Sequence, residues 1–296
     1  MRRKIDIYDT TLQNSPEWPA HHLTADNPGV IARRLDALGV DYIEIGSGPE
    51  NSIPYRELLE EGLSHARLTT AVRLPEDAEA LSRKDWAASL HSPATPTYTL
   101  IVNQSAAQTS VSKTSVDAYF EALGAAIRHF LALEREVLIE IEDFFEGYKR
   151  SADQMKKLVT SADAAGAHRL ILNETSGQTL PWEAGTIIHE MVSAFPKVKF
   201  GVHFHDLGHS AVAGALTAVD QGVVHVQGSI NGFGRRSGEA NLCNIIPDLE
   251  LKMGYVCLPE GNLPGLLDVA QLLMGSSSES TESGMRYVGR SELNPI

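Results

Sequence analysis

Short runs of β-branched and aliphatic residues alternate along this chain with longer stretches in which apolar residues recur at helical spacing. Each short run has the composition of a buried strand, and each longer stretch has a plausible length for a crossover connection. The eight predicted strands are the segments KIDIYD, VDYIEIG, RLTTAV, TYTLIV, EVLIEIE, HRLILN, VKFGVHF and VVHVQGS. The predicted helices that follow them are Asp26–Leu38, Pro54–His65, Pro75–Leu81, Ser115–Leu133, Ser151–Ala165, Trp182–Ala194, Ser210–Gln221 and Glu239–Met253.

Eight strand–helix units close naturally into a barrel, so we predict an α/β fold of the (β/α)₈ TIM-barrel class over residues 1–274. An open, doubly wound sheet is the alternative, but no glycine-rich fingerprint follows the first strand, where a dinucleotide-binding fold carries it. From residue 275 the sequence GSSSESTESG has the composition of a linker, and we predict a flexible linker and a short stub over 275–296. In such a barrel the chemistry belongs at the carboxyl ends of the strands.

Composition narrows the classes of function. The 296 residues are 43% hydrophobic and 21% charged, which is typical of a globular chain with a substantial core. A formal charge of −13, with no basic run, disfavours nucleic-acid binding. Two cysteines are too few for a disulfide framework, and no apolar signal or membrane segment follows the N-terminus. We therefore expect a cytoplasmic protein that binds neither nucleic acid nor membrane.

The segment GVHFHD provides the first candidate chemistry. His203 and His205 are two residues apart on the seventh predicted strand, so both side chains point to the same face and can hold one ion. Imidazole suits a borderline divalent cation, and oxygen partners shift the preference among manganese, magnesium and zinc. An isolated pair of this kind is otherwise a pair of core or rim histidines. The strand-end position, with Asp206 next to it, favours the metal.

The loop after the eighth predicted strand is rich in glycine and begins with Asn231 and Gly232. A helix that begins near Glu239 would point its backbone N–H groups at the mouth of the barrel. Such a loop suits an anionic substrate group, and it is equally compatible with a plain connection.

Four segments resemble one known family. Residues 226–255, VQGSINGFGRRSGEANLCNIIPDLELKMGY, resemble the strand-eight signature of the citramalate, isopropylmalate and homocitrate synthases. These enzymes belong to the DRE-TIM metallolyase superfamily, whose barrel is similar to that of HMG-CoA lyase. EDFFEGYK, NETSGQTLP and VDYIEIG resemble the same family at matching strands. The resemblance runs from about Ile5 to Ser291 and implies a TIM barrel.

The resemblance also implies a reaction. Synthases of this family join the methyl carbon of an acyl-CoA to a 2-oxo acid that is held by a divalent metal. The implied metal ligands are Asn14, His203, His205 and Glu239. Thr175 would help to hold the substrate carboxylate, and Glu44 would face the pocket from the second strand. A homodimer is expected by resemblance only.

This chain departs from the family pattern at positions that carry the family's chemistry. The family sequence TLRDG is TLQNS here, so Gln13 replaces an arginine and Asn14 replaces an aspartate ligand. In the strand-eight loop, Glu239 replaces an asparagine ligand. The two ligand exchanges leave the charge supplied to the ion unchanged, and hard cations accept either oxygen donor. We therefore expect that Mn²⁺, Mg²⁺ or Zn²⁺ binding is retained; the alternative is drift in a site that no longer binds.

Gln13 is the more costly change, because a neutral amide replaces a permanent charge with forked donors. Losing such stabilisation of a developing oxyanion costs on the order of 3 kcal/mol. Arg73, at the end of the third strand, and Arg235 or Arg236, near the eighth, are candidate replacements, although each is also compatible with a solvated surface charge.

Other candidates are weaker. Glu142 and Asp143 end the fifth predicted strand and would flank the site, and Glu142 fits the family better. His209 and the pair His21–His22 are possible acids or bases, but surface positions are more usual for them.

Three functions remain open. The segment YVGRS resembles the entry to the family's accessory lid, but ELNPI follows it in place of the lid's histidine segment. We expect either a partner that supplies a lid or a reaction that needs none. Family resemblance favours condensation of acyl-CoA with a 2-oxo acid, whereas Gln13 and the altered stub favour aldol cleavage. A non-catalytic barrel that binds a 2-oxo acid or partners a synthase is the third possibility.

Overall fold

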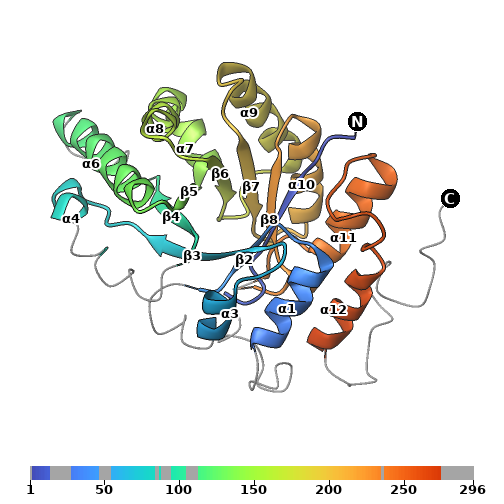
Figure 1. The fold of residues 1–296 in the computed structure, drawn as a ribbon. Helices are drawn as coiled ribbons and strands as arrows, with labels where there is room; N and C mark the ends of the chain where they lie inside the picture. Colours follow the sequence, from blue (N-terminus) through green and yellow to red (C-terminus); the bar gives the residue numbers. More distant parts are fainter. Residues whose placement is uncertain are drawn as a thin grey trace.

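A computed structural model describes residues 2–13, 28–46, 55–83, 87, 95–104, 113–234 and 237–274. Eight parallel strands form a closed barrel in chain order, with the last strand paired to the first (Figure 1). The predicted (β/α)₈ fold is therefore confirmed. The strands are β1 (Asp6–Asp9), β2 (Tyr42–Glu44), β3 (Arg67–Arg73), β4 (Thr97–Asn103), β5 (Glu136–Glu142), β6 (Arg169–Glu174), β7 (Phe200–Phe204) and β8 (His225–Gly228).

Helices lie outside the strands and bury one apolar face against them (Figure 1). Among the described residues, none of them combines the length and the apolar character that crossing a bilayer requires. The helices are α1 (Pro28–Leu38), α3 (Arg56–Glu61), α4 (Ala78–Arg83), α6 (Lys113–Ala132), α7 (Phe144–Arg150), α8 (Ala152–Ala165), α9 (Pro181–Ala194), α10 (Ala211–Asp220), α11 (Leu242–Pro247) and α12 (Gly265–Met274), with a 3₁₀ turn η3 (Ile230–Gly232) and a π-helical turn η4 (Asp248–Lys252).

Two of these helices were absent from the sequence interpretation. Helix α7 follows β5 after a single residue, Asp143, whose φ of 50° makes the abrupt turn between strand and helix. Helix α12 packs beside α1, so the last described helix covers the same side of the barrel as the first (Figure 1). The predicted boundary near Met274 coincides with the end of α12, but residues 275–296 lie outside the described part, and the division there stays a prediction.

The inward-facing residues form layers along the barrel axis, because every second residue of each strand points inward. At the amino-terminal end, Arg169 contacts Asp6 and lies 3.1 Å from Glu136, which also pairs with Arg67 at 2.6 Å. A largely aromatic layer closes the middle. Its members are Tyr8, Tyr42, Leu138, Ile171 and His225. Above it, toward the carboxyl ends of the strands, lie Glu44, Glu140, Asn173, His203 and Gln227.

Candidate active site

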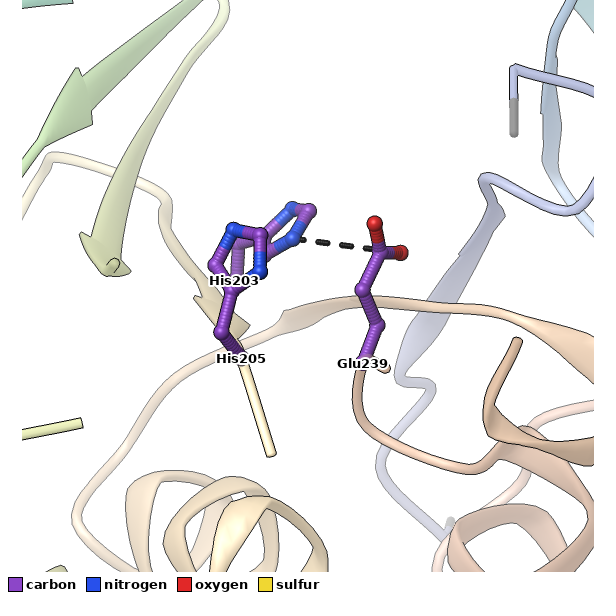
Figure 2. A group of neighbouring side chains, drawn as sticks. All are labelled: His203, His205 and Glu239. Carbon is purple, nitrogen blue, oxygen red and sulfur yellow. Dashed lines mark ion pairs between the residues drawn. The ribbon is translucent and has the colours of Figure 1, made fainter. Parts of the chain in front are cut away.

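Two imidazoles and a carboxylate converge at the carboxyl end of β7. His203 is the fourth residue of that strand and His205 follows its end, so the two rings lie side by side, 4.9 Å apart between centroids and tilted by 32° (Figure 2). Glu239 points toward them from the loop after β8, with its Oε2 3.9 Å from His203 Nε2. One ligand atom from each residue lies within 4.8 Å of the other two. The structure brings these three predicted residues together, and their role as metal ligands stays a prediction.

Glu239 reaches the histidines on an extended segment, residues 238–240, which we call the Glu239 strap. The strap runs antiparallel to the end of β7: Ala240 N donates to Phe204 O at 2.9 Å, and Asp206 N donates to Gly238 O at 2.9 Å. The expected helix start near Glu239 is therefore wrong. Helix α11 begins at Leu242, because backbone pairing with β7 keeps the strap extended until Asn241 caps the helix.

A tight turn in η3 makes this path possible. Asn231 and Gly232 have φ values of 62° and 71°, and Glu239 N donates to Gly232 O at 3.1 Å. Gly238 has a φ of 91° and lies against the Gly232 carbonyl, where a Cβ atom would collide. The amide of Asn231 donates to Ala270 O of α12 at 3.0 Å. These contacts give Asn231 and Gly232 a part in shaping the loop, and their substrate role stays a prediction.

The end of β1 holds the strap from the other side. The Thr10 hydroxyl donates to the carboxylate of Glu239, and Thr10 N donates to Gly228 O at 2.9 Å. Thr11 Oγ1 donates to Asp9 at 3.0 Å and accepts from Ile230 N at 2.8 Å. Burial raises the pKa of Asp9 to about 7, against the hydrogen bonds from Thr11. The residues at the end of β1 thus hold the loop that follows β8.

Two further carboxylates lie directly below this group. Glu44 accepts from the Tyr8 hydroxyl at 2.6 Å, and burial raises its pKa to about 8. Glu140 accepts from Asn173 Nδ2 at 2.6 Å, and burial again raises the pKa. Within the described residues, neither carboxylate forms an ion pair with lysine or arginine. The mouth therefore concentrates acidic groups around one imidazole.

His203 carries the atom that best tests a metal site. Its Nδ1 lies 2.8 Å from Gln227 Oε1, whereas its buried Nε2 has no hydrogen-bond partner among the described residues and faces Glu239. Burial lowers the pKa of the ring, but Glu140 and Glu239 outweigh burial and raise it. A divalent cation fits this arrangement, because two imidazoles and a carboxylate are suitable donors and the buried Nε2 lacks a partner.

A cation and an anion face each other at the rim. Arg73, at the end of β3, forms a forked ion pair with Glu142 at the end of β5, with Nη2 2.6 Å from Oε1. In the order of strands β3 lies opposite β7, so Arg73 faces the histidines from the far side of the mouth. About half of the Arg73 side chain is exposed. Such a position is open to an anionic group.

Thr175, just after β6, belongs to a chain of hydrogen bonds. It accepts from Asp143 N at 3.1 Å and donates to Asn173 Oδ1 at 3.1 Å, and Asn173 in turn donates to Glu140. The predicted substrate-binding hydroxyl is thereby linked to the buried acid layer.

Of the remaining predicted residues, the structure describes some and leaves others outside its described part. The backbone of Gln13 closes a turn onto Thr10 O at 3.1 Å. His209 is exposed, and its Nδ1 lies 3.4 Å from Asp206 Oδ2. Five predicted residues lie outside the described part of the chain, namely Asn14, His21, His22, Arg235 and Arg236.

Sequence reasoning missed Glu140, Asn173 and Gln227. The segment EVLIEIE contains a usable signal, because Glu140 precedes Glu142 by two residues and must share its face. Asn173 likewise precedes Thr175 by two. Gln227 has no such signal, since its neighbour depends on the register between β7 and β8.

Comparison with known proteins identifies similar sequences and structures. The model of the HMGL-like family matches residues 4–273. (R)-Citramalate synthase of Aquifex aeolicus is 30% identical over 295 residues, covering 98% of this chain and 56% of that protein. (R)-Citramalate synthase of Geobacter sulfurreducens is 32% identical over 309 residues, covering 97% of this chain and 55% of that protein.

This chain thus spans about half the length of these relatives. Among solved structures, the HMG-CoA lyase of Bacillus subtilis superposes with a TM-score of 0.68 at 20% identity, over 90% of this chain and 92% of the other. That likeness supports the barrel. Because the family match spans the barrel from β1 to α12, this chain belongs to the HMGL-like family.

Proposed function

We propose that this chain is the catalytic barrel of a divalent-metal-dependent enzyme that joins an acyl-CoA to a 2-oxo acid, in the manner of citramalate and isopropylmalate synthases. The observation that carries the proposal is the convergence of His203, His205 and Glu239 within 4.8 Å at the barrel mouth. The family membership and the synthase relatives support a carbon–carbon bond chemistry.

His203, His205 and Glu239 would hold the cation, with Asn14 as the further ligand implied by resemblance. When bound, the ion supplies Lewis acidity to the carbonyl and carboxylate oxygens of a 2-oxo acid. The buried Nε2 of His203 and the carboxylate of Glu239 support this assignment, because both point to one position and are shielded from water.

Glu44 is the proposed proton carrier. Its raised pKa of about 8 leaves it able to give or take a proton near neutral pH, and the Tyr8 hydroxyl holds one of its oxygens. Arg73 and Thr175 would bind the anionic end of the substrate, and Glu142 would hold the Arg73 guanidinium in place before the substrate arrives.

A second candidate is aldol cleavage of a 2-hydroxy acid at the same cation. Gln13 favours it, since the resemblance expects an arginine there and a neutral amide stabilises an oxyanion less by on the order of 3 kcal/mol. Arg73 at the rim favours condensation instead, because its positive charge is a candidate replacement for that of the missing arginine.

One assay separates the two reactions. The full chain is incubated with acetyl-CoA, Mn²⁺ and a panel of 2-oxo acids, and free thiol is measured. Condensation releases CoA and cleavage of a 2-hydroxy acid does not. Glu239→Ala should lower metal content and activity by about 100-fold or more, because it removes the anionic ligand. Glu121→Ala, at an exposed position of α6, is the matched control.

The outcomes divide cleanly. Thiol release that depends on Mn²⁺ and on Glu239 supports condensation. Metal binding with 2-hydroxy acid cleavage and no thiol release supports the second candidate. A parent chain that binds no Mn²⁺ by elemental analysis, or a Glu239→Ala variant that binds as much as the parent, contradicts the proposal and leaves a non-catalytic barrel.

A further inference from the structure

Gln227 lies beside His203 and has no role in the reaction proposed above. The two residues are register partners on the neighbouring strands β8 and β7, and both side chains point into the barrel. Gln227 is fully buried. Its Oε1 lies 2.8 Å from His203 Nδ1, on the opposite edge of the ring from Nε2.

In an imidazole ligand, the protonation of one ring nitrogen depends on what the other nitrogen binds. A neutral ring carries one proton, so a ring that binds a cation through Nε2 must keep its proton on Nδ1. A buried N–H group then needs an acceptor, and Gln227 Oε1 is at the right distance to accept. The same hydrogen bond fixes the rotation of the ring.

We propose that Gln227 is a positioning residue that holds the proton of His203 on Nδ1 and directs the Nε2 lone pair toward the cation. The inference rests on the proposed function, because it assigns His203 Nε2 to a metal ligand. Gln227 itself touches neither the cation nor the substrate.

One observation argues against a purely structural role. The other amide atom of Gln227, Nε2, is buried without a hydrogen-bond partner among the described residues, so His203 is the recorded side-chain partner of this amide. Burying an unsatisfied N–H group costs free energy of folding, which an apolar residue would avoid.

The choice of an amide also fits the charge of the site. Histidine ligands commonly donate their second N–H to a carboxylate or a carbonyl oxygen. Here Glu44, Glu140 and Glu239 already act electrostatically on His203. A glutamine accepts the hydrogen bond from Nδ1 without adding a further negative charge to this layer.

Zn²⁺ binding to the full chain, measured by calorimetry, tests the proposal with three variants. Gln227→Leu removes the acceptor at similar volume and should weaken binding about 10- to 100-fold. Gln227→Glu keeps an acceptor and should bind at least as tightly as the parent. Thr69→Val, which removes a buried hydroxyl without a recorded partner from β3, is the matched control and should bind as the parent does.

Nitrogen-15 NMR of His203 gives a second readout that a structural role would not move. At alkaline pH and without metal, the parent should show the proton on Nδ1, and Gln227→Leu should shift it toward Nε2. Identical spectra for the two proteins, or equal Zn²⁺ affinities, overturn the proposal. If the parent binds no Zn²⁺, the proposed function fails, and the metal-free spectra still decide for or against the role of Gln227.

Discussion

The two ends of the barrel interior use the same residue types in opposite ways. Glu136 and Glu140 both point inward from β5, four residues apart. At the amino-terminal end, burial alone would raise the pKa of Glu136, but Tyr42, Arg67 and Arg169 hold it below its usual range. At the mouth, burial raises the pKa of Glu140. One end balances its own charge, whereas at the other end Glu44 and Glu140 form no ion pair with lysine or arginine among the described residues.

This difference distinguishes the charged groups that join strands from those that surround the candidate cation site. The network of Asp6, Glu136 and Arg169 supplies both signs and joins β1, β5 and β6 at the closed end of the barrel. The mouth supplies mostly acidic groups around His203, and the cation that we propose there would offset their charge. In TIM barrels the amino-terminal end usually serves stability and the carboxyl end carries the chemistry, and the proposed cation site agrees with that division.

The pH dependence of stability offers the largest test of this contrast. Burial in the folded chain raises the pKa of Glu44 from its ordinary value of 4.5 to about 8. The folded state therefore binds more protons between these values, and the free energy of unfolding of the metal-free chain falls as pH rises through this window, by up to about 5 kcal/mol. Urea unfolding at a series of pH values measures the slope.

Glu44→Gln should flatten that slope, since a neutral amide does not titrate. An equally steep slope in the variant would show that Glu44 does not cause the pH dependence of the free energy of unfolding.

Breaking the amino-terminal network should lower the free energy of unfolding by slightly less than the pH change does. Arg169→Met leaves Asp6 and Glu136 short of a buried partner, and we expect a loss of about 4 kcal/mol in the free energy of unfolding. Arg33→Met removes an exposed ion pair with Glu61 and should cost less than about 1 kcal/mol. Chemical unfolding compares the two variants. Zn²⁺ affinity should be unchanged in both, and a loss in Arg169→Met would mean that the two ends are not independent.

Arg73 at the rim should show the smallest effect. Its pair with Glu142 is half exposed, so Arg73→Gln should change stability by less than about 1 kcal/mol. Removing its charge should weaken binding of a 2-oxo acid about tenfold, measured as KM or by calorimetry with pyruvate. Glu142→Gln serves as the partner variant and should leave the guanidinium free to bind the anion. Unchanged affinity in Arg73→Gln would assign the anion to another group.

Much of the fold followed from local pattern. The eight strand segments are predictable because buried parallel strands are short, apolar and bounded by helical stretches. The α7 turn was missed, since it depends on one residue, Asp143, in a left-handed conformation. The helix start near Glu239 was wrong for a different reason. The strap pairs with β7, a distant segment, and that pairing keeps Glu239 extended.

The sequence alone determined the barrel class, the family and the pair His203 and His205, because alternation along one strand is a local property. Only the tertiary structure decided which residues meet across strands. It placed Gln227 against His203, Arg73 against Glu142, and Glu239 beside the histidines. These contacts depend on strand register and barrel closure, which are long-range properties of packing that no short segment encodes.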